Sequence, residues 1–287
     1  MNRNFTLLTA LAFAGTAQAQ ITMQVVDSLT ADSLGACQGV SIQNGQVYLY
    51  GDREVGVIRN YTLENNSLQF TGREIKLTID GKDIINHPTG FAHNKTNKVF
   101  IGNSSRLNAE GTAWKANIFY INWKKLKKTG DLKKKLIREI DDDACIQGTR
   151  PEFIRYKEKQ FIATSDYGNK GNEVRLYDYK KMKRVSKTSS PGVLVHKFSC
   201  SPWVQNLKWV PEKGVLILIQ NQIEGRYWRF TFLDLEKSIL TGKEQVINTI
   251  NIDKPSELEG FDLLDLNTGI AVTSSRKNNV FHIKVTW

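Results

Sequence analysis

The chain has 287 residues, with 40 Lys and Arg against 29 Asp and Glu, for a formal net charge of +11. This excess favours anionic partners such as phosphates or acidic glycans, although a lysine-rich surface also serves solubility. After the first 20 residues no apolar run approaches the roughly 18 residues of a membrane span. The chain contains no CxxC or HExxH spacing that would indicate a zinc site.

The first 19 residues have the pattern of a signal peptide. Arg3 supplies a basic start, residues 7–13 are apolar, and Ala17-Gln18-Ala19 is a small-residue cleavage site. The sequence therefore predicts export, to the periplasm or by secretion, and a single mature domain over residues 20–287.

A repeated unit fills the rest of the chain, recurring five times at intervals of 51 to 63 residues. Each unit has an inner strand, a second strand after a turn such as Asn44-Gly45, and a third strand with alternating apolar residues. The third strands are predicted at residues 56–62, 117–123, 173–178, 227–233 and 280–285. This period is typical of a β-propeller, so the sequence predicts an all-β fold, a five-bladed β-propeller.

The two ends of the chain are expected to meet in the last blade. Residues 21–28 form a strand-like segment before the first repeat, and the chain stops at Trp287 after the third strand of the fifth repeat. We expect the N-terminal segment to supply the missing fourth strand, since this pairing closes the ring and covers an open sheet edge.

Two other features of the chain have structural interpretations. The lysine-rich run at residues 124–135 has no interleaved aromatic residues, so it predicts a solvated hairpin and not a nucleic-acid site. Cys145 and Cys200 precede the inner strands of blades 3 and 4, which makes a disulfide between them plausible in an oxidising compartment. Cys37 is then left as a buried thiol.

Polar residues occupy the start of each inner strand and the end of each second strand. In a propeller these positions converge on one mouth of the central channel, and fourteen residues separate the two sets within each repeat. The inner-strand set is Gln38, Thr89, Glu152, Asn206 and Glu259. The second-strand set is Asp52, Asn103, Asp166, Gln220 and Thr273.

This polar ring has two explanations at the level of sequence. Water fills the mouth of a channel, and polar residues line it for that reason alone. Alternatively, the inner-strand oxygens hold a Ca²⁺ ion, which takes about six to eight oxygen ligands. Asp52 and Asp166 would then orient the ligands or act as general bases.

The inner-strand ring resembles that of the secreted calcium-activated nucleotidases, the apyrases, which are five-bladed propellers. Glu152 in Arg-Pro-Glu-Phe and Glu259 in Leu-Glu-Gly-Phe fit glutamate positions of that family, and Asn206 can replace a hydroxyl ligand. Gln38 and Thr89 depart from the pattern. The resemblance implies one central Ca²⁺ held at these five positions.

A basic rim is expected around the same mouth. Arg53, Arg276, His87 and Arg150 fall in loops beside the polar ring, and such groups suit an anionic ligand. Asn103 and Gln220 are the further candidates for ligand binding.

Three functions remain open from the sequence. The first is a metal-dependent hydrolase of a phosphorylated or otherwise anionic small substrate. The second is a glycoside-active propeller with a carboxylate pair, either Glu152 with Asp166 or Asp52 with Glu259. The third is a non-catalytic propeller that binds a small molecule, glycan or protein. Under each of these functions the protein is expected to be a monomer. The chain has no GxSxG, GxxxxGK[ST] or dinucleotide motif that would favour another chemistry.

Overall fold

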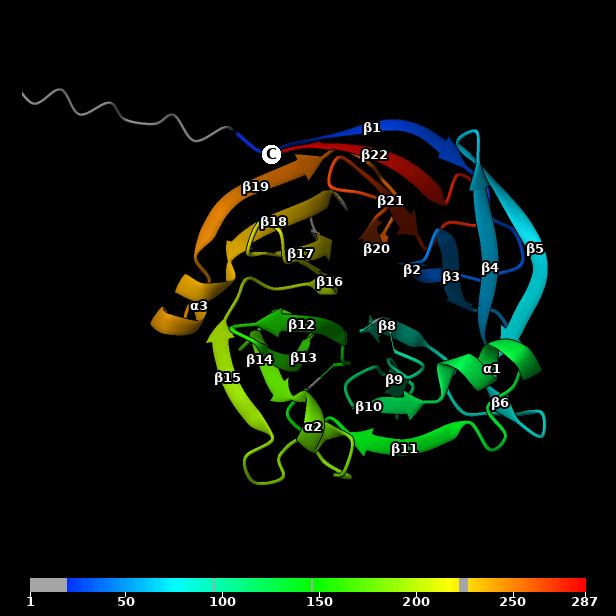
Figure 1. The fold of residues 1–287 in the computed structure, drawn as a ribbon, viewed down its shortest axis with the longest axis horizontal. Coiled ribbons are helices and arrows are strands. Elements are labelled where there is room, and N and C mark those ends of the chain that lie inside the picture. Colours follow the sequence, from blue (N-terminus) through cyan, green and yellow to red (C-terminus); the bar gives the residue numbers. More distant parts are fainter. Residues whose placement is uncertain (1–19, 95, 146, 222–226) are drawn as a thin grey trace, which may run out of the picture.

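The structure is a computed structural model that describes residues 20–94, 96–145, 147–221 and 227–287. The predicted signal peptide therefore lies outside the described residues. Five four-stranded antiparallel sheets are arranged around a common centre (Figure 1). The predicted five-bladed β-propeller is confirmed.

The blades follow the chain, and the first strand of each blade lies nearest the centre. Blade 1 consists of β2 (Cys37–Gln43), β3 (Gln46–Asp52), β4 (Gly56–Glu64) and β5 (Ser67–Lys76). Blade 2 consists of β8 (Pro88–His93), β9 (Val99–Arg106), β10 (Trp114–Ile121) and β11 (Leu136–Asp141). Blade 3 consists of β12 (Glu152–Tyr156), β13 (Lys159–Ser165), β14 (Glu173–Asp178) and β15 (Leu194–Ser199). Blade 4 consists of β16 (Val204–Val210), β17 (Val215–Asn221), β18 (Trp228–Asp234) and β19 (Val246–Ile252).

Blade 5 combines the two ends of the described chain. It consists of β20 (Leu258–Leu263), β21 (Thr268–Thr273), β22 (Val280–Thr286) and, as the outer strand, β1 (Thr22–Leu29). β1 runs antiparallel to β22, from the pair Thr22 and Thr286 to the pair Leu29 and Val280. The edge of β22 is thus paired, as expected from the sequence.

Short connections complete the fold. A two-stranded hairpin of β6 (Thr78–Ile79) and β7 (Lys82–Asp83) links blades 1 and 2. Helices α1 (Trp123–Thr129), α2 (Tyr179–Met182) and α3 (Leu235–Thr241) join the third and fourth strands of blades 2, 3 and 4. None of the described helices is long and apolar enough to span a membrane.

The hairpin predicted for residues 124–135 is wrong in its first half, which belongs to α1. The Asn122 side chain accepts a hydrogen bond from the backbone N–H of Lys125, and this N-cap starts the helix. Gly130 ends it with φ at 78°, a left-handed conformation that glycine adopts without strain. Trp123 and Leu126 are buried one turn apart, so α1 packs on the sheet through them.

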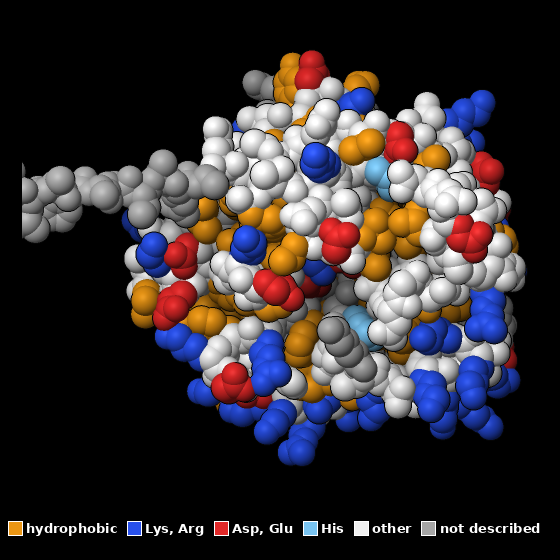
Figure 2. All heavy atoms as spheres, turned by 45° about the horizontal axis from the view of Figure 1, so that its top comes forward, with side chains coloured by type: hydrophobic (Ala, Val, Ile, Leu, Met, Phe, Trp, Pro, Cys, Tyr) orange, Lys and Arg blue, Asp and Glu red, His pale blue; other side chains and the backbone are white. Residues whose placement is uncertain are grey.

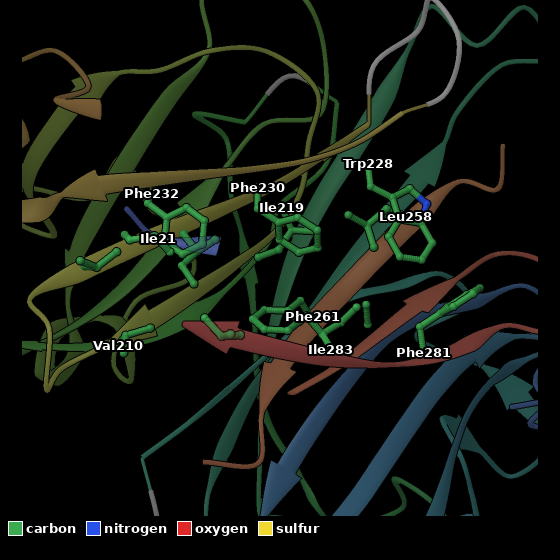
Figure 3. Packing of buried hydrophobic residues seen from close by; sticks show 14 residues of the cluster. Ile21, Val210, Ile219, Trp228, Phe230, Phe232, Leu258, Phe261, Phe281 and Ile283 are labelled. Atoms are coloured by element: carbon green, nitrogen blue, oxygen red, sulfur yellow. The ribbon is translucent and has the colours of Figure 1, made fainter. Parts of the chain in front are cut away.

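The core lies between neighbouring blades, where the inward faces of adjacent sheets pack together. Figure 3 shows this packing between blades 4 and 5. Trp228 is fully buried there, its ring centroid 4.8 Å from that of Phe281 in an edge-to-face contact, and its Nε1 donates to the carbonyl of Ser256 at 2.8 Å. Because Trp228 comes from blade 4 and Phe281 from blade 5, the contact joins the two blades.

The disulfide expected between Cys145 and Cys200 is not formed, because both are free thiols. Cys145 Sγ lies 3.9 Å from Thr164 Oγ1, whereas Cys200 Sγ lies 3.7 Å from Ser165 Oγ. Thr164 and Ser165 are consecutive in β13, and consecutive strand residues point to opposite faces of a sheet. The sheet of blade 3 therefore separates the two thiols. Cys37, the third cysteine, is buried as expected.

Replacement of Trp228 by Ala should lower the free energy of unfolding by about 3–5 kcal/mol, because it leaves a cavity between two blades. Trp287 offers a control of the same residue type at the edge of the same cluster, because it is only partly buried: its ring lies 5.7 Å from that of Phe232, and Lys213 Nζ lies 5.4 Å from it. Trp287→Ala should cost less than half as much in urea denaturation. Equal losses would show that the complete burial of Trp228 between the blades contributes no special stability.

Candidate functional site

Four of the five inner strands carry one extra residue where they begin. In β2, Cys37 pairs with Gly51 and Gly39 with Tyr50, which leaves Gln38 unpaired in a bulge. The same register shift occurs in β8, β16 and β20. A bulge re-aims a side chain and often marks a functional site. The bulged residues are Gln38, Thr89, Gln205 and Glu259.

Two of the predicted inner-strand positions are misaligned by one residue. The register places Glu152 and Asn206 opposite Ala163 and Ile219, at the place that Gly39 has in blade 1. A one-residue shift turns a strand side chain to the other face. The predicted equivalence of Glu152 and Asn206 with Gln38 is therefore wrong, and the bulged residue of blade 4 is its neighbour Gln205.

The bulge in blade 4 has a weak sequence signal. The alternation of Val204, Leu207 and Trp209 breaks between Val204 and Leu207, which are three residues apart, and that break is where the extra residue sits. In blade 3 the paired register begins at Glu152, directly after Pro151, and it contains no bulge.

The centre of the ring is filled below the bulges. Asn206 Nδ2 donates to the hydroxyl of Tyr50 at 3.2 Å and lies 3.5 Å from the carbonyl oxygen of Glu259. A Cβ atom on Gly39 would stand 2.1 Å from the Tyr50 hydroxyl oxygen, so only glycine fits at this crossing. These contacts fill the centre of the ring at the level of Gly39.

Asp52 and His87 form a pair at this mouth, although they come from different blades. His87 Nδ1 lies 2.8 Å from Asp52 Oδ2, with side-chain exposures of 33% and 25%. The other carboxylate oxygen of Asp52 accepts from the backbone N–H of Ala36 at 3.1 Å, and Gln38 Nε2 lies 3.5 Å from Oδ2. A carboxylate held in this way fixes the orientation of the imidazole ring.

Arg150 is the buried cation of the mouth. It is 3% exposed, and it donates to Ser104 Oγ at 3.3 Å and to Gln205 Oε1 at 3.1 Å. Among the described residues no carboxylate oxygen lies within 4.0 Å of it, and its Nε has no hydrogen-bond partner. Burial lowers the pKa of Arg150, and attraction to Glu259 opposes this effect. A buried charge without a counter-ion is costly, so this arrangement favours an anion.

Glu259 is the buried acid of the mouth. It is 4% exposed, and burial together with repulsion from Glu257 raises its pKa well above the usual value, against the attraction of Arg150. Glu257 itself accepts from Gln205 Nε2 at 3.2 Å. The raised pKa favours the protonated form of Glu259 more than for an exposed carboxyl, which makes this residue a candidate proton donor.

Four other predicted residues are engaged in holding loops. Asn103 Oδ1 accepts from the backbone N–H of His87 at 2.9 Å, and Gln220 Nε2 donates to the carbonyl of Pro202 at 2.6 Å. The Thr89 hydroxyl donates to the carbonyl of Thr149. Asp166 pairs with Arg175 at 3.0 Å while its Oδ1 accepts from the N–H of Gln147 at 3.2 Å. These contacts position the loops around the mouth.

No contact among the described residues places Arg53 or Arg276 at the mouth. Arg53 is paired with Glu74 at 2.8 Å and with Glu54 at 3.0 Å, toward the outer part of blade 1. Arg276 is exposed in the loop after β21.

A second buried polar cluster involves Glu152, Lys208 and Asp262. Lys208 Nζ lies 2.6 Å from Asp262 Oδ1 and 3.9 Å from Glu152 Oε1, and Glu152 accepts from the N–H of Trp209 at 3.1 Å. Burial raises the pKa of Glu152 to about 7, although Lys208 attracts its charged form.

Figure 2 shows a hollow near the middle of one face, with acidic and basic side chains beside it.

The five predicted calcium ligands do not converge in this geometry. Glu152 faces Lys208, the side-chain Oδ1 of Asn206 accepts from the backbone N–H of Leu207 at 2.8 Å, and the Thr89 hydroxyl donates to a carbonyl. Within the described parts of the chain, no group of three or more His, Cys, Asp or Glu could hold a metal. Only Gln38 and Glu259 remain at the mouth, beside the Arg150 cation. These side chains fit an anion better than Ca²⁺, and we derive no step through a metal.

No protein-family model matches the chain, and no curated protein matches its sequence. The resemblance to calcium-activated nucleotidases therefore stays a prediction. Solved structures with a similar fold include a hydrazine synthase of Kuenenia stuttgartiensis (10% identity, TM-score 0.44), a glucose dehydrogenase (10%, 0.44) and the computationally designed Ika8 protein (11%, 0.40). They cover 85%, 91% and 94% of this chain, which spans 65%, 85% and 84% of theirs. At TM-scores below 0.5 they carry no argument about its chemistry.

Replacement of Glu152 by Gln should change how stability depends on pH. The folded-state pKa of about 7 exceeds the ordinary 4.5, so the native protein holds a proton that the unfolded chain has released. The free energy of unfolding therefore falls as pH rises from about 4.5 through 7, because Glu152 must ionise in the folded protein. Above pH 7 this group causes no further change. Relative to wild type, Glu152→Gln should gain roughly 2–3 kcal/mol in the free energy of unfolding between pH 5 and pH 8. Urea denaturation at several pH values measures this difference.

Lys208→Met is the companion variant to Glu152→Gln, because it removes only the cation of the same cluster. It leaves two buried carboxylates without their partner, so it should cost about 3–5 kcal/mol at pH 8. Parallel stability curves for wild type and Glu152→Gln would show that Glu152 is hydrated and titrates normally.

Proposed function

We propose that the mouth formed by the bulged inner strands binds a small anionic molecule, whose acidic group Arg150 receives. The observation that carries this proposal is the burial of Arg150 without a carboxylate within 4.0 Å among the described residues. An anionic ligand supplies the missing counter-charge to a buried guanidinium, where charge-assisted hydrogen bonds are strong.

Hydrolysis of an ester of that anion is the reaction that this set of side chains supports. When His87 Nδ1–H donates to Asp52, Nε2 is left to take a proton from an attacking water. Glu259, whose pKa is raised by burial, gives its proton to the leaving oxygen. Arg150 compensates the charge that develops between them. Both proton-transfer groups then recover by exchange with solvent.

Export, predicted from residues 1–19, belongs to the same proposal, since an exported hydrolase meets its substrate outside the cytoplasm. The central calcium ion remains an alternative occupant of the mouth. The two are distinguished below by the response to Ca²⁺.

Replacement of Arg150 by Gln removes the charge and keeps a hydrogen-bonding side chain. We expect the Kd for anionic probes to rise at least about tenfold, because a charged hydrogen bond is worth about 1.5–3 kcal/mol. The probes are inorganic phosphate, citrate and p-nitrophenyl phosphate, followed by calorimetry and by the shift in Tm. Arg155→Gln is the control, because Arg155 is exposed and pairs with Glu158 on the surface.

Hydrolysis would be supported if the rate of nitrophenolate release falls about a hundredfold or more in both His87→Asn and Glu259→Gln. Binding without release would restrict the function to binding. Equal affinity of wild type and Arg150→Gln would overturn the proposal. A saturable rise in Tm with Ca²⁺ that Glu259→Gln abolishes would favour the cation instead.

A further inference from the structure

A second pocket lies between the sheet of blade 1 and helix α1, away from the central mouth. It has a volume of about 250 Å³, with Ile58 and Ile75 among its apolar lining and Tyr48, Asn60, Arg73 and Lys127 among its polar lining. The lining residues of β3, β4 and β5 occupy alternate positions, so they share the sheet face that α1 covers.

The pocket carries two cations and no acid. Arg73 and Lys127 both line it, and neither has a carboxylate oxygen within 4.0 Å among the described residues. Glu74, next to Arg73 in β5, belongs to the opposite sheet face and pairs with Arg53 at 2.8 Å and with Arg59 at 3.4 Å. Burial, and repulsion from Arg73, lower the pKa of Lys127. An anion in the pocket would relieve this repulsion.

Two aromatic rings hold Lys127 in place. Its Nζ lies 5.8 Å from the ring centroid of Tyr48 and 5.5 Å from that of Trp123. The other lysines of α1 differ, since Lys124, Lys125 and Lys128 are exposed. Figure 2 shows Lys and Arg side chains gathered on the side of the molecule where Figure 1 places α1. Lys127 is thus separated from a general basic surface by its packing.

Asn60 contributes an acceptor that needs a donor. Its Oδ1 is buried and has no hydrogen-bond partner, in the wall that also holds the cations. A buried acceptor without a donor costs about 1–3 kcal/mol. A ligand that satisfies the whole pocket must therefore offer anionic oxygens to Arg73 and Lys127 and one hydroxyl to Asn60.

We propose that this pocket binds a soluble phosphate in a form that carries a hydroxyl, as hydrogen phosphate or as a small phosphate ester with an alcohol group. The anionic oxygens accept from Arg73 and Lys127, and the hydroxyl donates to Asn60 Oδ1. Sulfate has the same shape and charge but no proton to donate, so the pocket discriminates against it. The site shares no residue with the central mouth and does not depend on the function proposed there.

The test is calorimetric titration of the full chain with inorganic phosphate and with sulfate at pH 7.5 and constant ionic strength. We expect phosphate to bind about tenfold more tightly than sulfate, the worth of roughly one hydrogen bond. Lys127→Met and Arg73→Gln should each weaken phosphate binding about tenfold or more. Lys128→Met, a change of the same charge on the same helix, should leave it unchanged.

Several outcomes would overturn the proposal. Equal losses in Lys127→Met and Lys128→Met would show only a general electrostatic effect, and equal binding of sulfate would remove the role of Asn60. Loss of phosphate binding in Arg150→Gln alone would assign the ligand to the central mouth and support the function proposed there. Binding to phosphatidate vesicles without binding to glycerol 3-phosphate would identify a lipid headgroup in place of a soluble phosphate.

Discussion

The central site depends on one backbone constraint, the extra residue at the start of four inner strands. Strand side chains alternate between two faces, so one inserted residue re-aims the side chain that carries it without disturbing the apolar pattern that follows. Glu259 and Gln205 reach the mouth in this way. The following position must then be small in most blades, because the inner strands come closest there, and Gly39 meets the Tyr50 hydroxyl at this level. The register of blade 3 has no bulge, and Pro151, just before its inner strand, packs against Gly90 of the neighbouring blade.

The two buried polar clusters near the axis differ in how their charges are balanced. Lys208 lies between two carboxylates, Glu152 and Asp262, so the cation has its counter-ions within the fold. Such a cluster needs no ligand to explain it. Each buried charge is balanced by its partner, and stability is lost only when one partner is removed. Arg150 has hydroxyl and amide partners but no carboxylate within 4.0 Å among the described residues, and Glu259 acts on it from farther away. The fold leaves this charge incompletely balanced, and this physical difference is the reason why the proposed ligand is assigned to Arg150 and not to Lys208.

The repeat period and the alternation of apolar residues were sufficient to predict the five blades, because both follow from burial on sheet faces. They were not sufficient for the site, because a bulge leaves the alternation intact on either side and shifts the side chain by one residue. Gln205 was missed and Asn206 was chosen for this reason. The same periodicity placed Cys145 and Cys200 in equivalent loops, but it could not show that the sheet of blade 3 separates them. Helix α1 was missed although Asn122 and Gly130 are ordinary cap residues, since the lysines around them suggested a solvated turn.

One strand connects the two proposed sites. Tyr48, Tyr50 and Asp52 alternate along β3, so all three point from the same face of blade 1 toward blade 2. Tyr48 lines the pocket beside α1, Tyr50 fills the ring centre, and Asp52 orients His87 at the mouth. This shared strand fixes the separation of the sites, but fixed separation is not coupling. Coupling needs an element with two arrangements that both ligands bias. Tyr50 is buried and held by Asn206 and by stacking on Phe91 at 6.2 Å, so it is packed on both sides. We therefore expect the two proposed sites to bind their ligands independently.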